Sequence, residues 1–94
     1  MKTIHKHSLN TGNEVQELKL TEDAVIRRVD FYLQDRTIKM WVEVDADTFM
    51  ETPKTVRRFK VFHTGDGIPD NARYTGTTIN HMKPDSYHVY ELVD

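Results

Sequence analysis

Residues 24–46, "AVIRRVDFYLQDRTIKMWVEVDA", decide the fold class, because apolar and polar side chains alternate along most of this stretch. In its second half, one face consists of Ile38, Met40, Val42, Val44 and Ala46. The opposite face consists of Thr37, Lys39, Trp41, Glu43 and Asp45. Successive side chains of a strand point to opposite faces of a sheet, so this period of two predicts β-structure with one buried face.

The first half of the stretch repeats the alternation with irregularities. The predicted apolar face consists of Val25, Val29, Phe31 and Leu33, with Arg27 as an exception. The polar face consists of Arg28, Asp30 and Tyr32, with Ile26 as an exception. Residues 35–36 between the two halves are a candidate two-residue turn, although they lack the glycine of the strongest hairpin signals. We therefore predict an antiparallel hairpin.

The rest of the chain is interpreted as further strands. They are predicted at residues 2–9, 15–20, 55–63, 72–80 and 87–93, with Gly76 marking a possible bulge. Turns or loops are predicted at residues 10–13, 45–54 and 82–86. Six or seven strands with frequent turn signals predict a single all-β domain over residues 1–94, which is a small antiparallel sandwich or partly open barrel.

The stretch "HTGDGIP", residues 63–69, is rich in turn residues. Gly65 and Gly67 can adopt positive φ angles, and Ile68 is restricted to extended geometry because Pro69 follows it. We predict that at least one of these glycines has a positive φ. We also expect Ile68 to be buried as an apolar anchor at the edge of the core.

The composition excludes several function classes. The absence of cysteine excludes disulfides, zinc–thiolate sites and a thiol nucleophile. A formal net charge of −2 argues against a general nucleic-acid binder. No apolar run approaches the roughly 20 residues of a membrane span, and the first residues lack the apolar region of a secretory signal. We therefore expect an intracellular protein that does not bind membranes.

Catalytic and metal-binding motifs are weak in this sequence. It contains no nucleophile elbow and no phosphate-binding P-loop. Asp66 and Asp70 fall on an expected exposed turn, where their pKa values would not be split as acid–base catalysis requires. His5 and His7 share a strand face and could bind a metal with a third histidine, but this spacing alone is a weak signal. We therefore expect no enzyme activity, no cofactor and no metal.

Several short motifs, in their order along the chain, resemble a family of small phage-encoded proteins of unknown function. These motifs are the start "MKTIHK", the segment from Trp41 to Asp45, the turn Thr64-Gly65-x-x-Ile68-Pro69, the group Tyr74, Gly76 and Thr77, and the string "YHVYE" at 87–91. The resemblance implies a phage or prophage origin and hence the cytoplasm of an infected bacterial host. It implies no catalytic residues.

A tryptophan on a polar strand face is the strongest sign of binding. Trp41 must be covered by a second sheet, a loop or a subunit, or it must be exposed to bind a partner. The candidate binding residues are Trp41, Tyr32, Arg28, Arg58, His63 and Asp66. We predict a non-catalytic phage accessory protein that binds a host protein or a small anionic ligand, as a homo-oligomer with Trp41 at the subunit contact. The alternatives are a metal-dependent or other enzyme that uses the histidines, and a minor virion component.

Overall fold

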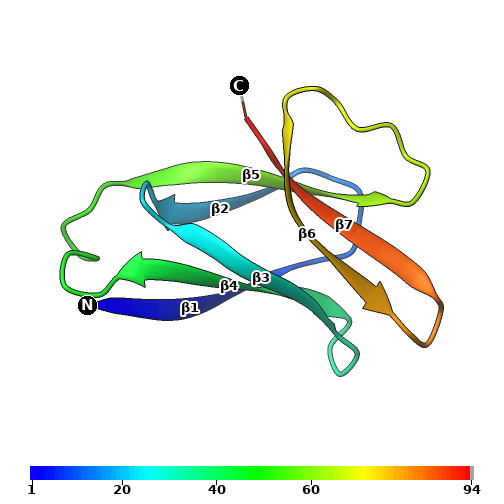
Figure 1. The fold of residues 1–94 in the computed structure, drawn as a ribbon, viewed down its shortest axis with the longest axis horizontal. Coiled ribbons are helices and arrows are strands. Elements are labelled where there is room, and N and C mark those ends of the chain that lie inside the picture. The colour runs from blue at the N-terminus through cyan, green and yellow to red at the C-terminus, as the bar shows by residue number, and fades with distance from the viewer. Residues whose placement is uncertain (94) are drawn as a thin grey trace.

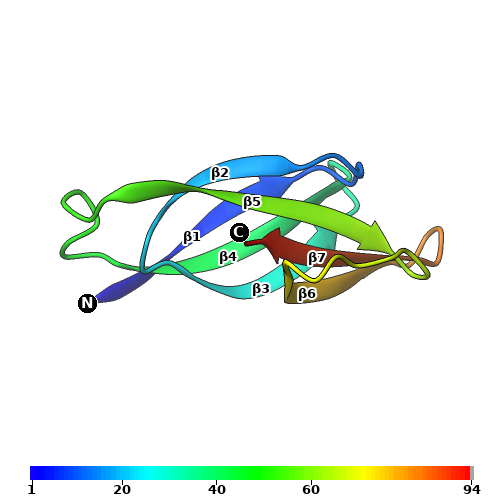
Figure 2. The ribbon, with the colours of Figure 1, turned by 90° about the horizontal axis from the view of Figure 1, so that it is seen from above.

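The computed structural model describes residues 1–93, which form seven strands and no helix (Figure 1). The strands are β1 (Lys2–Leu9), β2 (Gln16–Thr21), β3 (Val25–Tyr32), β4 (Thr37–Asp45), β5 (Lys54–His63), β6 (Ala72–Asn80) and β7 (Asp85–Leu92). They form a three-stranded sheet, β1-β4-β3, and a four-stranded sheet, β2-β5-β7-β6, and all pairs are antiparallel. The all-β prediction is confirmed, as an open two-sheet sandwich rather than a closed barrel (Figure 2).

The predicted hairpin is confirmed as β3 and β4, but its turn differs from the prediction. The strands are joined by residues 33–36 rather than by two residues, and the Arg36 N–H donates to the Tyr32 carbonyl at 2.9 Å. Arg36 has a φ of 58°, in the left-handed region that favours glycine. Leu33, predicted on the apolar face, lies in this turn and is 49% exposed, because the strand ends before it.

The irregularity around Arg27 is a β-bulge. The register of β3 against β4 shifts between Ile26 and Arg28, so Arg27 is the extra residue. This insertion reverses the alternation, and Ile26 therefore faces the core opposite Val42. The predicted place of Val25 on the apolar face is wrong for the same reason, and Val25 is 42% exposed.

The hydrophobic core lies between the inner faces of the two sheets. It consists of Leu9, Leu20, Ala24, Val29, Ile38, Met40, Val42, Val44, Phe59, Val61, Tyr87 and Val89. Val29 of β3 and the four residues from β4 were predicted on an apolar face from the alternation. Apolar side chains from both sheets are thereby removed from water, which is the main favourable contribution to folding.

One ion pair stands on the inner face of the four-stranded sheet. The Arg57 guanidinium binds both carboxylate oxygens of Glu91, with Nε–Oε2 at 2.7 Å and Nη2–Oε1 at 2.8 Å. Its third nitrogen, Nη1, donates to the Ala24 carbonyl at 2.7 Å. Hydrogen bonding to Glu91 raises the pKa of Arg57. This group fixes the β2–β3 connection to β5 and β7.

The two sheets meet where the edge strands β3 and β6 lie side by side (Figures 1 and 2). The Phe31 N–H of β3 donates to Thr78 Oγ1 of β6 at 2.8 Å. A Cβ atom on Gly76 would lie only 2.6 Å from Val29 Cγ2, so this close approach requires glycine. The register of β6 shifts between Tyr74 and Gly76, which confirms the predicted bulge.

Candidate functional site

The structure divides the six predicted binding residues between the two sheets. Arg28, Tyr32 and Trp41 lie on the outer face of the three-stranded sheet. Arg58 lies on β5 of the other sheet, on the side that also carries Lys60 and Phe62, and His63 and Asp66 lie at the end of that strand. The six residues therefore do not form one site.

We call the outer surface formed by Lys6, Arg28, Tyr32, Lys39 and Trp41 the aromatic face. Trp41 stands on the central strand β4, directly opposite Lys6 on β1 and Arg28 on β3. The rings of Tyr32 and Trp41 are 5.9 Å apart between centroids, and both side chains are partly exposed. Lys6 Nζ lies 5.8 Å from the Tyr32 centroid, within cation–π range. The second sheet does not cover Trp41, since Trp41 points away from the core.

Lys39, one of the cations of the aromatic face, already has hydrogen-bond partners. Lys39 is buried, and its Nζ donates to Ser8 Oγ and to Asp35 Oδ2, both at 2.9 Å. Hydrogen bonds from Lys39 and then from Thr37 lower the pKa of Asp35 to about 2. The alternating pattern of the sequence placed Lys39 on the polar face. The pattern could not show that the aliphatic part of the Lys39 side chain is buried.

The two arginines of β3 are paired to different extents. Arg27 Nη2 lies 2.9 Å from Glu43 Oε2, and hydrogen bonding to Arg27 lowers the pKa of Glu43. Arg28 Nη2 is 3.3 Å from Asp30 Oδ2, and the Arg28 side chain is largely exposed. Lys6 has no ion pair within the described residues. Lys6 and Arg28 are thus the cations on the aromatic face with most capacity for a new partner.

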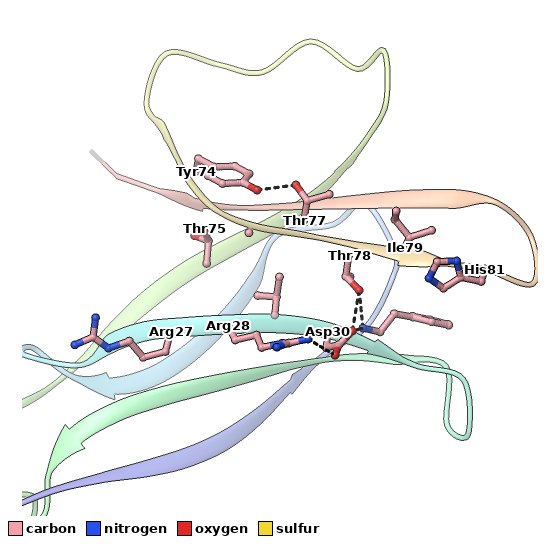
Figure 3. Close-up of a pocket in the computed structure, with 12 residues that line it drawn as sticks. Arg27, Arg28, Asp30, Tyr74, Thr75, Thr77, Thr78, Ile79 and His81 are labelled. Atoms are coloured by element: carbon pink, nitrogen blue, oxygen red, sulfur yellow. Dashed lines mark hydrogen bonds and ion pairs between the residues drawn. The ribbon is translucent and has the colours of Figure 1, made fainter.

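A groove of about 580 Å³, here called the edge groove, runs between β3 and β6 (Figure 3). Arg27 and Arg28 line it from β3, and the hydroxyls of β6 line it from the other side. The lining hydroxyl residues are Tyr74, Thr75, Thr77 and Thr78. Arg28 belongs both to this groove and to the aromatic face, so the two surfaces are continuous.

The turn at residues 63–66 is held by its own hydrogen bonds. Asp66 Oδ2 accepts from the His63 N–H at 2.8 Å, and the Asp66 N–H donates to the His63 carbonyl at 3.0 Å. Gly65 has a φ of 97°, which confirms the predicted positive φ. The predicted burial of Ile68 is wrong, because the loop extends beyond the ends of β5 and β6 and leaves Ile68 40% exposed (Figure 1).

A chain of side-chain hydrogen bonds crosses the outer face of the four-stranded sheet. His88 Nε2 lies 3.0 Å from Thr64 Oγ1, and His88 Nδ1 lies 3.1 Å from Thr77 Oγ1. Thr77 Oγ1 is in turn 2.8 Å from the Tyr74 hydroxyl. This chain ties the start of the 64–71 loop to β7 and β6. Our sequence reasoning missed the chain, although its members lie in the short turn and strand motifs quoted above.

The histidines are dispersed over the structure. His5 and His7 share one face of β1 as predicted, and this is the inner face, opposite Val42 and Met40. His5 contacts the Phe49 ring edge-on at a centroid distance of 4.8 Å. Burial, followed by the charge of His5, lowers the pKa of His7. Within residues 1–93, no group of three or more His, Asp or Glu side chains is arranged to hold a metal ion.

Comparisons with known proteins identify a family for this chain. A family model described as "Domain of unknown function (DUF7352)" matches residues 1–94. No curated protein and no solved structure matches the chain. Among the described residues, no helix is long and apolar enough to span a membrane.

Proposed function

The chain belongs to the family described as a domain of unknown function (DUF7352), and from this premise we propose that it is a non-catalytic binding protein. The observation that supports this best is the pair Tyr32 and Trp41, which stays partly exposed beside Lys6 and Arg28 on a sheet face that the core does not use. Aromatic and arginine side chains dominate the energetics of protein contacts. The aromatic face is therefore the proposed binding surface.

The proposed partner is a protein rather than an enclosed small molecule. The aromatic face is open, and it continues through Arg28 into the shallow edge groove. Lys6 and Arg28 favour an acidic surface on that partner. A second copy of the chain is the first partner to consider, because a domain of this size has a small core and gains stability by association.

The cellular role that we propose follows from the motif resemblance. The protein would act as a phage accessory factor in the cytoplasm of an infected bacterial host, where it binds a host protein. Sequestration of a small anionic ligand is the other form of this proposal. A minor virion component and an enzyme that uses the histidines are the alternatives.

Sedimentation of the wild-type protein and of Trp41→Ala tests the proposed contact. We expect the wild type to form a homo-oligomer and Trp41→Ala to weaken association by about 2 kcal/mol, which is roughly thirtyfold in Kd. Val56→Ala is the control, because it removes an exposed apolar side chain from β5 of the other sheet, outside the edge groove, and should leave association unchanged.

A monomeric wild type would contradict the oligomer. Affinity purification from infected bacteria then tests binding to a host protein. A partner retained by the wild type and by Val56→Ala, but lost from Trp41→Ala, would support the aromatic face. If every retained protein is unaffected by Trp41→Ala, that face is not the binding surface.

A further inference from the structure

The β3–β4 and β6–β7 turns lie at the same end of the sandwich (Figure 1). Residues of both turns line a second concave surface. We call it the end hollow. Its volume is about 350 Å³, and residues of both turns line it together with Phe31 and Tyr87 from the strands. It lies apart from the aromatic face and shares only Phe31 with the edge groove.

Part of the wall of the end hollow is apolar and open to solvent. The rings of Phe31 and Tyr87 pack against each other with centroids 5.4 Å apart. Leu33, which is half exposed, and Met82, which is 73% exposed, extend this apolar surface outward from the two turns. Exposed apolar side chains gathered around a concave surface are a feature of ligand sites.

Two cationic side chains also line the end hollow. They are Arg36 from one turn and Lys83 from the other, and neither side chain has a hydrogen bond or ion pair with the residues that the structure describes. Asp85 is the one carboxylate among the described lining residues, so the formal charge of the lining is positive. An apolar wall beside these two cations is complementary to a molecule with an apolar tail and an anionic head.

The backbone of Arg36 has an unusual conformation for a residue with a side chain. Its φ of 58° lies where a residue with a side chain is strained and glycine is favoured. The hydrogen bond from its N–H to the Tyr32 carbonyl closes the β3–β4 turn around it. The chain therefore carries a guanidinium at a turn position that glycine would occupy with less strain.

We infer that the end hollow binds a small amphipathic anion, such as a medium-chain fatty acid. The tail would pack on Phe31, Leu33 and Met82, and the carboxylate would bind Arg36 and Lys83. The volume falls within the range of small-molecule sites, about 300–1,000 Å³. This inference does not depend on the protein-binding role of the aromatic face.

Decanoate is the test ligand, at concentrations below its micelle formation, with calorimetry for affinity and amide NMR shifts for location. We expect saturable binding that shifts the amides of residues 33–36, 81–83 and 85. Octanoate should bind more weakly, by about fourfold for each CH₂ that is removed. Absence of saturable binding, or shifts confined to other parts of the protein, would overturn the inference.

Two variants test the role of the cations. Arg36→Gly removes the guanidinium, and glycine readily adopts the left-handed φ, so the turn should be retained. Decanoate affinity should fall on the order of tenfold, because a charge-assisted hydrogen bond is lost, and Lys83→Gln should also weaken binding. Neither variant should change the weaker binding of decanol, which has no charge.

Lys6→Gln is the matched control, since it removes a cation from the aromatic face. It should leave decanoate affinity unchanged, whereas it should weaken the protein contact proposed above. An unchanged decanoate affinity in both Arg36→Gly and Lys83→Gln, with both variants folded, would refute the assigned head-group site. The two proposals can therefore fail independently.

Discussion

Both outer faces of the sandwich carry large aromatic side chains, but these side chains are buried to different extents on the two faces. Phe62 on the four-stranded sheet is only 3% exposed, because the Tyr90 ring meets it edge-on at 5.5 Å and Lys60 Nζ lies 5.1 Å from its centroid. Trp41 on the three-stranded sheet stays partly exposed, and the residues directly opposite it are Lys6 and Arg28. The alternation of a strand thus determines which face a side chain occupies, whereas its neighbours determine whether it is covered.

The largest expected effect tests this contrast in burial. Phe62→Ala should lower the free energy of unfolding by about 3 kcal/mol, because it removes a large side chain from a covered position. Trp41→Ala should cost about 1 kcal/mol, since part of the ring is already in contact with water. Urea denaturation of the two variants measures the difference. Equal losses of stability would show that the two faces are covered to the same degree.

A smaller effect is expected where the two sheets meet. Gly76→Ala should destabilise the protein by about 1–3 kcal/mol, since the new Cβ would lie 2.6 Å from Val29 Cγ2. This contact fixes β6, which carries Tyr74 and Thr77 to the outer face of the four-stranded sheet. Gly67→Ala is the matched control, because a Cβ atom added there would have no neighbouring atom within 4 Å.

Thermal melting of the two glycine variants provides the measurement. The Gly67→Ala variant should stay within about 0.5 kcal/mol of the wild type. If Gly76→Ala is as stable as Gly67→Ala, the contact between β3 and β6 does not hold the sheets in place.

The smallest expected effect concerns an exposed charge beside the aromatic face. NMR titration should give Asp35 a pKa of about 2, below its ordinary value of 3.8, because Lys39 and Thr37 donate hydrogen bonds to its ionised form. A lowered carboxyl pKa stabilises the folded protein above about pH 4, and this contribution is lost as the pH falls towards 2. The contribution is small, since Asp35 is exposed.

The variant Asp35→Asn should remove this part of the acid dependence and leave the rest of the unfolding curve unchanged. A titration midpoint near 3.8 in the wild type would mean that the hydrogen bonds of Asp35 do not persist in solution.

Local patterns predicted the strands and much of the core, but not the way in which the strands pair. The β3–β4 hairpin could be identified because both strands and their turn lie within residues 24–46. The pairing of β1 with β4, and of β2 with β5, joins segments that are distant in the sequence, and no local signal specifies it. The bulge at Arg27 was visible only as a break in alternation, so the face of Val25 was assigned incorrectly.

The candidate site, like the fold, could be predicted only where neighbouring residues in the sequence determine it. The alternation placed Trp41 and Tyr32 together on the polar face, and their 5.9 Å ring distance confirms this. Ile68 was misplaced because the conformation of a glycine-rich loop depends on tertiary contacts as well as on its own residues. The end hollow could not be foreseen, since its two turns approach each other only after both sheets have formed.

The position of β7 has a consequence for synthesis on the ribosome. β7 pairs with both β5 and β6, yet it follows both of them in the chain. The three-stranded sheet can assemble as soon as β4 has left the exit tunnel, because β1 and β3 are already available. The edges of β5 and β6 that later pair with β7 stay unpaired until residues 85–92 emerge. During that interval a chaperone or another nascent chain has access to β5, whose Phe59 and Val61 later become fully buried.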